Sequence, residues 1–294
     1  MSHHVLDEIQ SQPEVWARAA AIGSVGTDLP RPGERIAVIG CGTSWFMAMC
    51  YAVLRESAGL GWTDAFTATE LPRGRAYDRV LAITRSGTTT EVLEALAALQ
   101  GRTPTVAITG DPATPIADAA DAIVALDFAD ERSVVQTRFA TTVLALLRAS
   151  LGEDLGVVVE DARSALDRPV DAYLEATQVS FLGNGWTVGL AHEAALKMRE
   201  AAQAWTEAYP AAEYRHGPVS VAEPGRLTWL LGTAPAGLEE EIAATGATFV
   251  HHADLDPMAA LIVAQRTAVA LALRRGLDPD QPRNLTRSVI LASR

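Results

Sequence analysis

The chain has 294 residues, of which 49% are hydrophobic, so it can form one large domain or two domains of ordinary size with full cores. A net charge of −12 without a basic stripe argues against a nucleic-acid partner, and no apolar run reaches the roughly 18 residues of a membrane span without a charge or a breaker. The two cysteines, Cys41 and Cys50, indicate neither a disulfide framework nor a zinc site, and the acidic amino-terminal sequence does not resemble a signal peptide, so we expect a cytoplasmic protein.

The first predicted elements are a helix, a strand and a second helix. Residues 5–22 are predicted to be a helix that ends before a proline- and glycine-rich breaker. Residues 35–39 form a short apolar strand, and the next helix runs to about residue 58. The turn between them reads GCGTS, and its glycines let backbone amides approach an anion at the helix start. The turn lacks the GxGxxG spacing and no acidic residue is placed for a ribose, so we do not expect a nucleotide site.

A loop rich in hydroxyl groups follows the third predicted strand. Strands are predicted at 65–69 and 79–83, and the latter is followed by Thr84 to Thr90, which reads TRSGTTT, before a helix at 91–99. Thr88 and Glu91 have the spacing of a capping box. Helix capping alone would explain about two of the five hydroxyls. Hydroxyls and free amides at a helix start also suit a phosphate monoester, so the loop is predicted to bind phosphate.

Strands at 105–108 and 123–126 continue the alternation of strands and helices. The later helix begins after the segment ERSVVQT, which ends at Thr137, and runs through Leu146. Strands that are apolar at nearly every residue and alternate with helices indicate a parallel sheet covered on both faces. Such sheets bind ligands at the carboxyl ends of their strands, where both hydroxyl-rich turns are expected to lie.

The second half of the chain repeats this design. After a polar, mostly helical connection at 152–175, strands are predicted at 178–182, 226–231 and 248–251, with helices after the first strand, near 238–244 and over 257–275. IGCGTSW and LGNGWTV occupy corresponding places, which favours one strand-helix design used twice. Only the first copy keeps the hydroxyl cluster, so we expect it to hold a phosphate. The second copy holds a lysine, glutamates and a histidine, so we expect it to carry the chemistry.

Residues 189–218 contain these groups. The segment is predicted to be one long helix, a turn and a loop that ends in His216-Gly-Pro. Lys197 is the only lysine of the chain, against 23 arginines, which suggests that a primary amine matters at this position. Glu193, Lys197 and Glu200 are spaced i, i+4, i+7 and therefore share one helix face. The alternative is a solvated salt-bridge ladder, but the alanine-rich helix around them favours burial.

These motifs resemble those of the sugar isomerase (SIS) family. Within it, the likeness is strongest to the isomerase half of glutamine–fructose-6-phosphate aminotransferase and extends to amino-sugar-phosphate deaminase/isomerases. It covers nearly the whole chain through EIQSQPE, GCGTS, TRSGTTTE, ERSVVQTRFATT, EAALKMRE, AEYRHGP and DPDQPRNLTRSV. The resemblance implies an α/β fold of two tandem SIS domains, each a flavodoxin-like parallel sheet flanked by helices. Their expected bounds are 1–30 for an amino-terminal arm, 31–165 for SIS domain 1, and 166–294 for SIS domain 2 with a carboxyl-terminal tail. A homodimer with sites near the subunit interface is also implied.

Carried over by position, the resemblance assigns roles to individual residues. Val134 would lie in the substrate wall. Glu200 would move a proton between C1 and C2 of the sugar, a step that suits a carboxylate. Lys197 would stabilise the oxygen of an enediolate or enolamine. His216 would open the sugar ring, in its own or a neighbouring subunit's site; a lone histidine is more often structural, but the His-Gly-Pro loop beside this helix favours function. The sugar-phosphate binders would be Thr43, Ser44, Thr84, Arg85, Ser86, Thr88, Thr89 and Arg287.

Two departures from the aminotransferase shape the expected reaction. We expect no glutamine-hydrolysing domain, and Arg287 stands where the aminotransferase has a lysine that forms a Schiff base. We therefore expect an amino-sugar 6-phosphate isomerase that deaminates its substrate, acting on glucosamine 6-phosphate or galactosamine 6-phosphate without metal or organic cofactor. The alternatives are a fructosamine-6-phosphate deglycase and a non-catalytic sugar-phosphate sensor.

Overall fold

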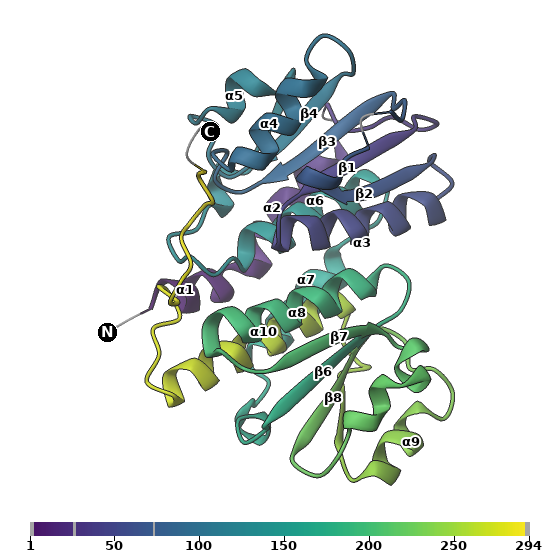
Figure 1. Cartoon of the computed structure of the whole chain (residues 1–294), viewed down its shortest axis with the longest axis vertical. Helices are drawn as coiled ribbons and strands as arrows, with labels where there is room; N and C mark the ends of the chain where they lie inside the picture. Colours follow the sequence, from purple (N-terminus) through teal and green to yellow (C-terminus); the bar gives the residue numbers. More distant parts are fainter. Residues whose placement is uncertain (1–2, 26–27, 73, 292–294) are drawn as a thin grey trace. The chain divides into compact units, whose positions relative to one another are not determined.

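Two parallel β-sheets, each flanked by helices, make up the chain in the computed structural model (Figure 1). The structure describes residues 3–25, 28–72 and 74–291. The described residues divide into two units. The β1–β5 unit takes those within Glu14–Arg132, Gln136–Leu155 and Thr286–Arg294, and the β6–β9 unit takes those within Met1–Pro13, Ser133–Val135 and Gly156–Leu285.

The β1–β5 unit is built on a five-stranded sheet of order β2-β1-β3-β4-β5, the order of flavodoxin-like sheets. All neighbouring strands are parallel, as the alternation of strands and helices predicted. Every residue of β1 and β4 is buried, which explains their mostly apolar sequences, IAVIG and TVAIT. The strands are β1 (Ile36–Gly40), β2 (Thr63–Thr67), β3 (Arg79–Thr84), β4 (Thr105–Thr109) and β5 (Ala122–Ala125).

Helices cover this sheet, and its core includes Ile39, Val80 and Leu96. Helix α3 packs on α6, and a Trp16 indole N–H donates to the Thr141 hydroxyl on α6 at 2.9 Å. The helices are α2 (Gln12–Ser24), α3 (Thr43–Ser57), α4 (Thr90–Leu99), α5 (Ile116–Ala119) and α6 (Arg138–Ser150), with 3₁₀ turns η1 (Ala68–Glu70) and η2 (Asp127–Ala129).

The β6–β9 unit has a four-stranded parallel sheet of order β7-β6-β8-β9, the order of the first sheet with one strand fewer. Its core includes Leu182, Tyr214 and Ile242. The strands are β6 (Gln178–Gly183), β7 (Thr206–Pro210), β8 (Arg226–Leu231) and β9 (Thr248–His251). The helices are α1 (His4–Gln10), α7 (Gly156–Leu166), α8 (Thr187–Ala202), α9 (Leu238–Thr245) and α10 (Pro257–Arg274), with 3₁₀ turns η3 (Asp171–Tyr173), η4 (Glu213–His216) and η5 (Pro218–Val221).

Helix α10 is long and apolar enough, by length and composition, to cross a membrane. Most of it is buried, and it packs against α7 and α8, beside which it lies in Figure 1. A core helix that is apolar on all sides has the same composition. The composition of α10 is therefore explained by its packing within the β6–β9 unit.

The predicted helix over residues 5–22 is wrong as a single element. Helix α1 ends at Gln10, and α2 starts at Gln12. Pro13 has no N–H to donate, and its ring would clash with the carbonyl of Ile9 in a continuous helix. The break at Ser11 follows from this.

Strand β7 was missed, because residues 206–210 were predicted to be a turn and a loop. The strand lies at the sheet edge and is only half-buried, so its TEAYP sequence lacks the apolar run of a central strand. Its last residue, Pro210, is tolerated at an edge. A repeat could have revealed it: WTDAFTATE at 62–70, which contains the edge strand β2, corresponds to WTEAYPAAE at 205–213.

A glycine ends the first strand of each sheet and lets the following helix start against it. A Cβ on Gly40 would lie 2.7 Å from the backbone carbon of Ser44, and one on Gly183 would lie 2.2 Å from the Thr187 carbonyl oxygen. Real Cβ atoms do not approach backbone so closely. Glycine is therefore required for the close strand-to-helix turns predicted at both positions.

Candidate functional site

A small polar pocket lies at the carboxyl ends of β1 and β3 in the β1–β5 unit. It includes six of the predicted substrate-binding residues, and Thr43 and Thr88 do not line it. Val134 belongs to the β6–β9 unit, where its backbone N–H donates to the Asp280 carbonyl at 2.9 Å. The lining residues are Cys41, Ser44, Ile83, Thr84, Arg85, Ser86, Thr89, Val92, Gln136 and Arg287.

The hydroxyl loop at 84–90 does not contain the predicted capping box. Helix α4 starts at Thr90, its N-cap is Thr89, and no side chain accepts a cap hydrogen bond. The Thr88 hydroxyl instead lies 3.1 Å from the Ser86 hydroxyl and 2.9 Å from the Ser288 hydroxyl of the tail. The capping-box prediction is therefore wrong, because the helix begins one residue later than that spacing requires.

Arg85 is buried in the pocket wall and has a buried acidic neighbour. Its side chain is 2% exposed, and its Nη1 lies 4.0 Å from Oε2 of Glu131, which is 0% exposed. Arg85 Nη2 also donates to the Arg287 carbonyl at 2.8 Å. A buried guanidinium needs such compensation, because an unpaired charge in the interior is costly.

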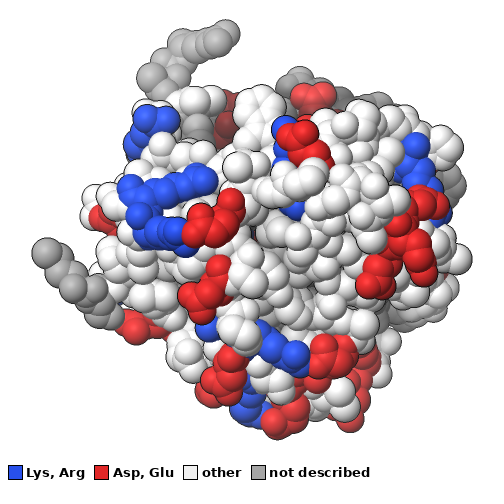
Figure 2. Space-filling model, turned by 90° about the horizontal axis from the view of Figure 1, so that it is seen from below, with Lys and Arg blue, Asp and Glu red and all other residues white. Residues whose placement is uncertain are grey.

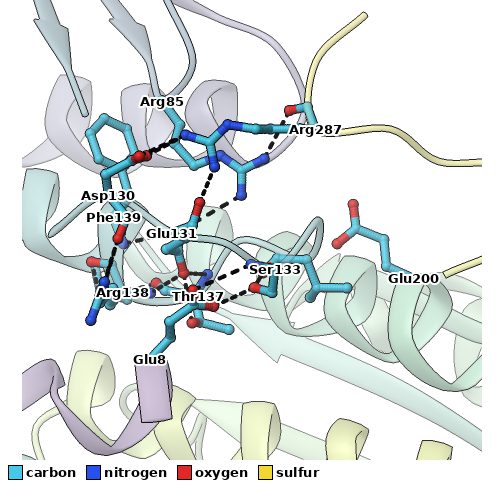
Figure 3. Close-up of polar contacts among 12 residues, drawn as sticks. Glu8, Arg85, Asp130, Glu131, Ser133, Thr137, Arg138, Phe139, Glu200 and Arg287 are labelled. Carbon is cyan, nitrogen blue, oxygen red and sulfur yellow. Dashed lines mark hydrogen bonds and ion pairs between the residues drawn. The ribbon is translucent and has the colours of Figure 1, made fainter. Parts of the chain in front are cut away.

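Glu131 joins the pocket to the start of helix α6, and sequence reasoning missed it. Its Oε1 accepts from the Thr137 N–H at 2.6 Å, the Thr137 hydroxyl at 2.8 Å and the Arg138 N–H at 2.8 Å. The carboxylate thus satisfies the free N–H groups of the first turn and stabilises the positive helix end. Figure 3 shows Glu131 between these donors and Arg85. An acid six residues before a threonine at a helix start is the signal that could have indicated it.

Arg287 adds a second guanidinium to the pocket. Its Nη2 lies 2.6 and 2.8 Å from the two carboxylate oxygens of Asp130, and its Nη1 donates to the Glu131 carbonyl. The tail continues along the hydroxyl loop, where the Thr90 N–H donates to the Val289 carbonyl at 3.1 Å. The arginine that replaces the expected Schiff-base lysine is therefore an ion-paired group of the pocket.

Cys41 also lines the pocket. Burial raises the pKa of its thiol, with a further contribution from nearby Glu91. The thiol is therefore protonated at neutral pH, and it is a poor nucleophile or metal ligand there.

Lys197, Glu193 and Glu200 share one face of α8, as their spacing predicted. Lys197 Nζ lies 2.6 Å from Glu200 Oε2 and 3.4 Å from Glu193 Oε1. The side chains of Lys197 and Glu193 are 1% and 0% exposed, whereas Glu200 is 19% exposed. The low exposed fractions of Lys197 and Glu193 exclude the alternative of a salt-bridge ladder on a solvent-exposed helix face. The ammonium is held between two carboxylates, and Glu200 is the carboxylate that solvent can reach.

His216 ends the 3₁₀ turn η4 and is exposed. Among the described residues, no hydrogen bond or ion pair joins it to the Lys197 cluster. Gly217 follows with φ of +133°, a conformation that favours glycine. The structure therefore brings Lys197 and Glu200 together and leaves His216 on a separate loop of the same unit.

His3, Asp278 and Asp280 are the one group in the described part of the chain whose side chains could hold a metal ion. The two Asp280 carboxylate oxygens already accept the backbone N–H groups of His4 and Val5 at 2.8 Å each. These bonds hold the start of α1 within the β6–β9 unit, which explains Asp280 without a metal.

Known proteins resemble the chain over nearly its whole length. Residues 31–151 match the SIS domain model. Glutamine–fructose-6-phosphate aminotransferases [isomerizing] from Pyrobaculum aerophilum and Gloeobacter violaceus are 27% and 29% identical, over 98% of this chain and 57% and 58% of theirs. The chain thus spans less than two thirds of the length of these relatives.

Solved structures have the same fold. Glucosamine-6-phosphate deaminase from Thermotoga maritima is 25% identical with a TM-score of 0.80, covering 98% of this chain and 100% of that one. Tagatose-6-phosphate ketose/aldose isomerase from Escherichia coli shares the fold at 20% identity and a TM-score of 0.76, covering 98% and 95%. The chain therefore contains an SIS domain at residues 31–151, and its fold is that of these solved structures.

Proposed function

We propose that the chain is a deaminating aldose–ketose isomerase of an amino-sugar 6-phosphate. The observation that carries this proposal is the ion pair between the buried Lys197 and the partly exposed Glu200, whose Nζ and Oε2 atoms lie 2.6 Å apart. A carboxylate that is reachable and held by a fixed ammonium suits a proton transfer at carbon. The 25% identity to the Thermotoga maritima glucosamine-6-phosphate deaminase supports the choice of substrate class.

The proposed reaction needs one proton carrier and one stabilised oxygen. After the sugar ring opens, with His216 as the proposed acid-base group, Glu200 takes the proton from C2 of the 2-amino aldose. The Lys197 ammonium stabilises the oxygen anion that develops at C1. Glu200 returns the proton to C1 and one amine proton passes to the C1 oxygen, which leaves a hydroxyl at C1 and an imine at C2. Water hydrolyses this imine to the ketose 6-phosphate and ammonia.

The phosphate group is assigned to the pocket of the β1–β5 unit. Its hydroxyls and the Arg85 guanidinium are donors that match the acceptor-rich phosphate oxygens. This division of tasks follows the sequence prediction, in which the first copy binds and the second copy reacts. No step requires a metal or an organic cofactor, because a carboxylate suffices for the proton shift.

The test is an ammonia-release assay with glucosamine 6-phosphate, galactosamine 6-phosphate and their N-acetyl forms. Glu200→Gln should lower kcat by about 10²–10⁴-fold, the usual contribution of a general base, and leave sugar-phosphate binding in place. Glu240→Gln, on the exposed face of α9, is the matched control and should keep wild-type turnover. Full turnover in Glu200→Gln would rule out its assigned role.

A fructosamine-6-phosphate deglycase is the second candidate, because its reaction begins at the same C1–C2 unit. Arg287 argues against the aminotransferase reaction, because a guanidinium cannot form the Schiff base expected of the aminotransferase lysine, and the deglycase therefore stays a candidate. Turnover of 6-phosphofructosyl-lysine without ammonia release from hexosamine 6-phosphates would select this reaction. Thermal stabilisation by sugar phosphates without any turnover would select a sensor.

We further propose that the β6–β9 unit is a second SIS domain. The order β7-β6-β8-β9 repeats β2-β1-β3-β4, and the sequence repeats that begin at Trp62 and Trp205 contain the corresponding edge strands β2 and β7. The predicted domain bounds of 31–165 and 166–294 and a cytoplasmic homodimer complete this proposal. Light scattering coupled to size-exclusion chromatography measures the mass in solution. For the homodimer, we expect a mass near twice 31.2 kDa.

A further inference from the structure

Each unit has a tryptophan and an acid at the start of its edge strand. The sequence repeats WTDAFTATE and WTEAYPAAE make Trp62 equivalent to Trp205 and Asp64 equivalent to Glu207. The tryptophan comes directly before the edge strand, and the acid is its second residue, on β2 in one unit and on β7 in the other. The surroundings of these two pairs can therefore be compared residue by residue.

In the β1–β5 unit, the chain supplies its own cations to the tryptophan and the acid. The Arg35 guanidinium carbon lies 5.1 Å from the centre of the Trp62 ring and 5.7 Å from that of Tyr77. Arg75 Nη1 lies 3.2 Å from Asp64 Oδ2, and the Tyr77 hydroxyl donates to the same oxygen at 2.6 Å. A cation over an aromatic face and a cation on a carboxylate are both favourable.

The β6–β9 unit lacks all three of these side chains. The segments ERIAVIG and TQVSFLG correspond, as do YDRVLAIT and GRLTWLLG, and the parallel registers of the two sheets agree with this alignment. Counting along the chain without a gap places Gln178 where the first unit has Arg35, Gly225 where it has Tyr77, and Glu223 where it has Arg75.

A cavity of about 300 Å³ lies at this place, at the starts of β6, β7 and β8, which are side by side in the sheet (Figure 1). Trp205 is 74% exposed, against 59% for Trp62, and no arginine of the described residues lies over the Trp205 ring. The cavity therefore offers an uncovered indole face. Its lining residues are Thr177, Gln178, Trp205, Glu207, Val221 and Arg226.

The charges around the cavity do not balance. In the described part of the chain, Glu207 has no ion-pair partner, and its polar neighbours Gln178 and Tyr209 are uncharged. Arg226 is the basic residue of the cavity wall, and its Nη2 lies 2.6 Å from Glu223 Oε1. Two acids thus share one base, which leaves the Glu207 charge without compensation.

The cavity is separate from the proposed catalytic pair. The Thr206 hydroxyl donates to the Ala195 carbonyl of α8 at 2.8 Å, so this side chain of β7 faces α8. Successive side chains of a strand point to opposite faces, and Glu207 therefore lies on the sheet face away from α8. Lys197 and Glu200 belong to α8.

We infer that this cavity is a second binding site, which takes a small organic monocation of the guanidinium type. The ligand's cation stacks on the Trp205 ring and pairs with the Glu207 carboxylate. It occupies the position that Arg35 holds over Trp62 in the other unit, and it supplies the one positive charge that the cavity lacks. The inference does not depend on the proposed function, because no residue of this cavity takes part in that reaction.

The test is ¹⁹F NMR on protein labelled with 5-fluorotryptophan, which has six tryptophans to report. The Trp205 signal is identified by its absence in Trp205→Phe, and the Trp62 signal in the same way. N-butylguanidinium at millimolar concentration should shift the Trp205 signal. N-butylurea has nearly the same shape without the charge and should leave the signal in place. The Trp62 signal should not move, because Arg35 already covers that ring.

Three variants connect the shift to the charge. Glu207→Gln should raise the concentration of N-butylguanidinium that gives half the maximal shift by about tenfold, the scale of one hydrogen bond to a charged group. Gln178→Arg should abolish the shift, because the new side chain can cover Trp205 as Arg35 covers Trp62. Glu240→Gln removes an acid from the exposed face of α9 and should respond like the wild type.

Several outcomes would overturn the inference. They are no shift of the Trp205 signal with N-butylguanidinium, an equal shift with N-butylurea, and an unchanged half-maximal concentration in Glu207→Gln. Light scattering on Gln178→Arg should give the wild-type mass; a lower mass would show that an arginine of a second copy fills the cavity, which would overturn a site for a small ligand. Thermal unfolding checks each variant, and Glu207→Thr replaces Glu207→Gln if the latter does not fold.

Discussion

At the residue scale, Glu131 is a buried carboxylate that connects the pocket residue Arg85 with the start of α6. It satisfies donors of α6 and lies beside the Arg85 guanidinium, while being fully buried. Removing one partner of a buried charged pair leaves the other charge uncompensated. The stability of the β1–β5 unit and the geometry of its pocket therefore both depend on the Glu131 carboxylate.

Replacing Glu131 with Ala should lower the free energy of unfolding by about 3–5 kcal/mol, because Arg85 loses its buried acidic neighbour and the first turn of α6 loses its acceptor. Urea denaturation measures this loss. Glu94→Ala, at an exposed position of α4, is the control and should stay within about 0.5 kcal/mol of the wild type. Equal losses in the two variants would contradict the assigned role of Glu131.

Sequence reasoning identified the pocket residues that carry hydroxyls but not the acids that organise them. Ser44, Ser86 and Thr89 follow strand ends in a recognisable pattern, and they line one pocket. Glu131 and Asp130 are separated along the chain from Arg85 and Arg287, with which they interact. Local spacing contains no information on such pairs, since the fold alone brings them together.

At the element scale, central strands were easier to predict than edge strands. The residues of β1 are all buried and therefore all apolar or small, whereas β7 is half-buried and mixes threonine, glutamate and proline. Helix ends were misplaced where a single residue determines the end of the helix, as Pro13 does at the start of α2 and Thr89 at the start of α4.

The strand-to-helix turn after β1 gives a prediction for Gly40→Ala. The new Cβ would meet the backbone of Ser44 at 2.7 Å, so α3 must move away from the strand. Such overpacking typically costs about 1–3 kcal/mol of stability, and the shift of Ser44 should weaken binding of glucitol 6-phosphate. Thermal unfolding and calorimetry measure the two effects. Gly74→Ala, where the added Cβ meets nothing within 4 Å, should change neither.

At the scale of the whole molecule, the repeat of one sheet design could be predicted, but the membership of the end segments could not. Described residues near the amino terminus belong to the β6–β9 unit, because Asp280 accepts the first N–H groups of α1. The tail at 286–291 belongs to the β1–β5 unit through Arg287. On the face drawn in Figure 2, acidic and basic side chains occur in small groups separated by uncharged residues, in keeping with a chain without a basic stripe.

The stability of the molecule should fall as the pH is lowered below about 6.5, the ordinary pKa of histidine. Burial lowers the pKa of His252, and nearby Arg168 and His251 lower it further, against the opposite effect of Asp254. The unfolded chain therefore takes up the proton first as the pH falls, and this shifts the equilibrium toward unfolding.

Urea denaturation between pH 7.5 and 5.5 measures this dependence. The loss of stability should be smaller in His252→Gln, which has no ring to protonate, than in the wild type. His4→Gln, an exposed position, is the control and should follow the wild type. If His252→Gln loses as much stability as the wild type, other groups cause the pH dependence. His192 is then the next residue to replace, because burial also lowers its pKa.

The single buried lysine has a consequence for how the protein can be observed. Reagents that acylate amines have one side-chain target in the whole chain, and that target is 1% exposed between two carboxylates of α8. Labelling of Lys197 therefore requires a transient opening of that helix. The labelling rate, read by mass spectrometry on the peptide that contains Lys197 so that the amino-terminal amine is not counted, reports how often the proposed catalytic helix opens at this position, with no engineered probe.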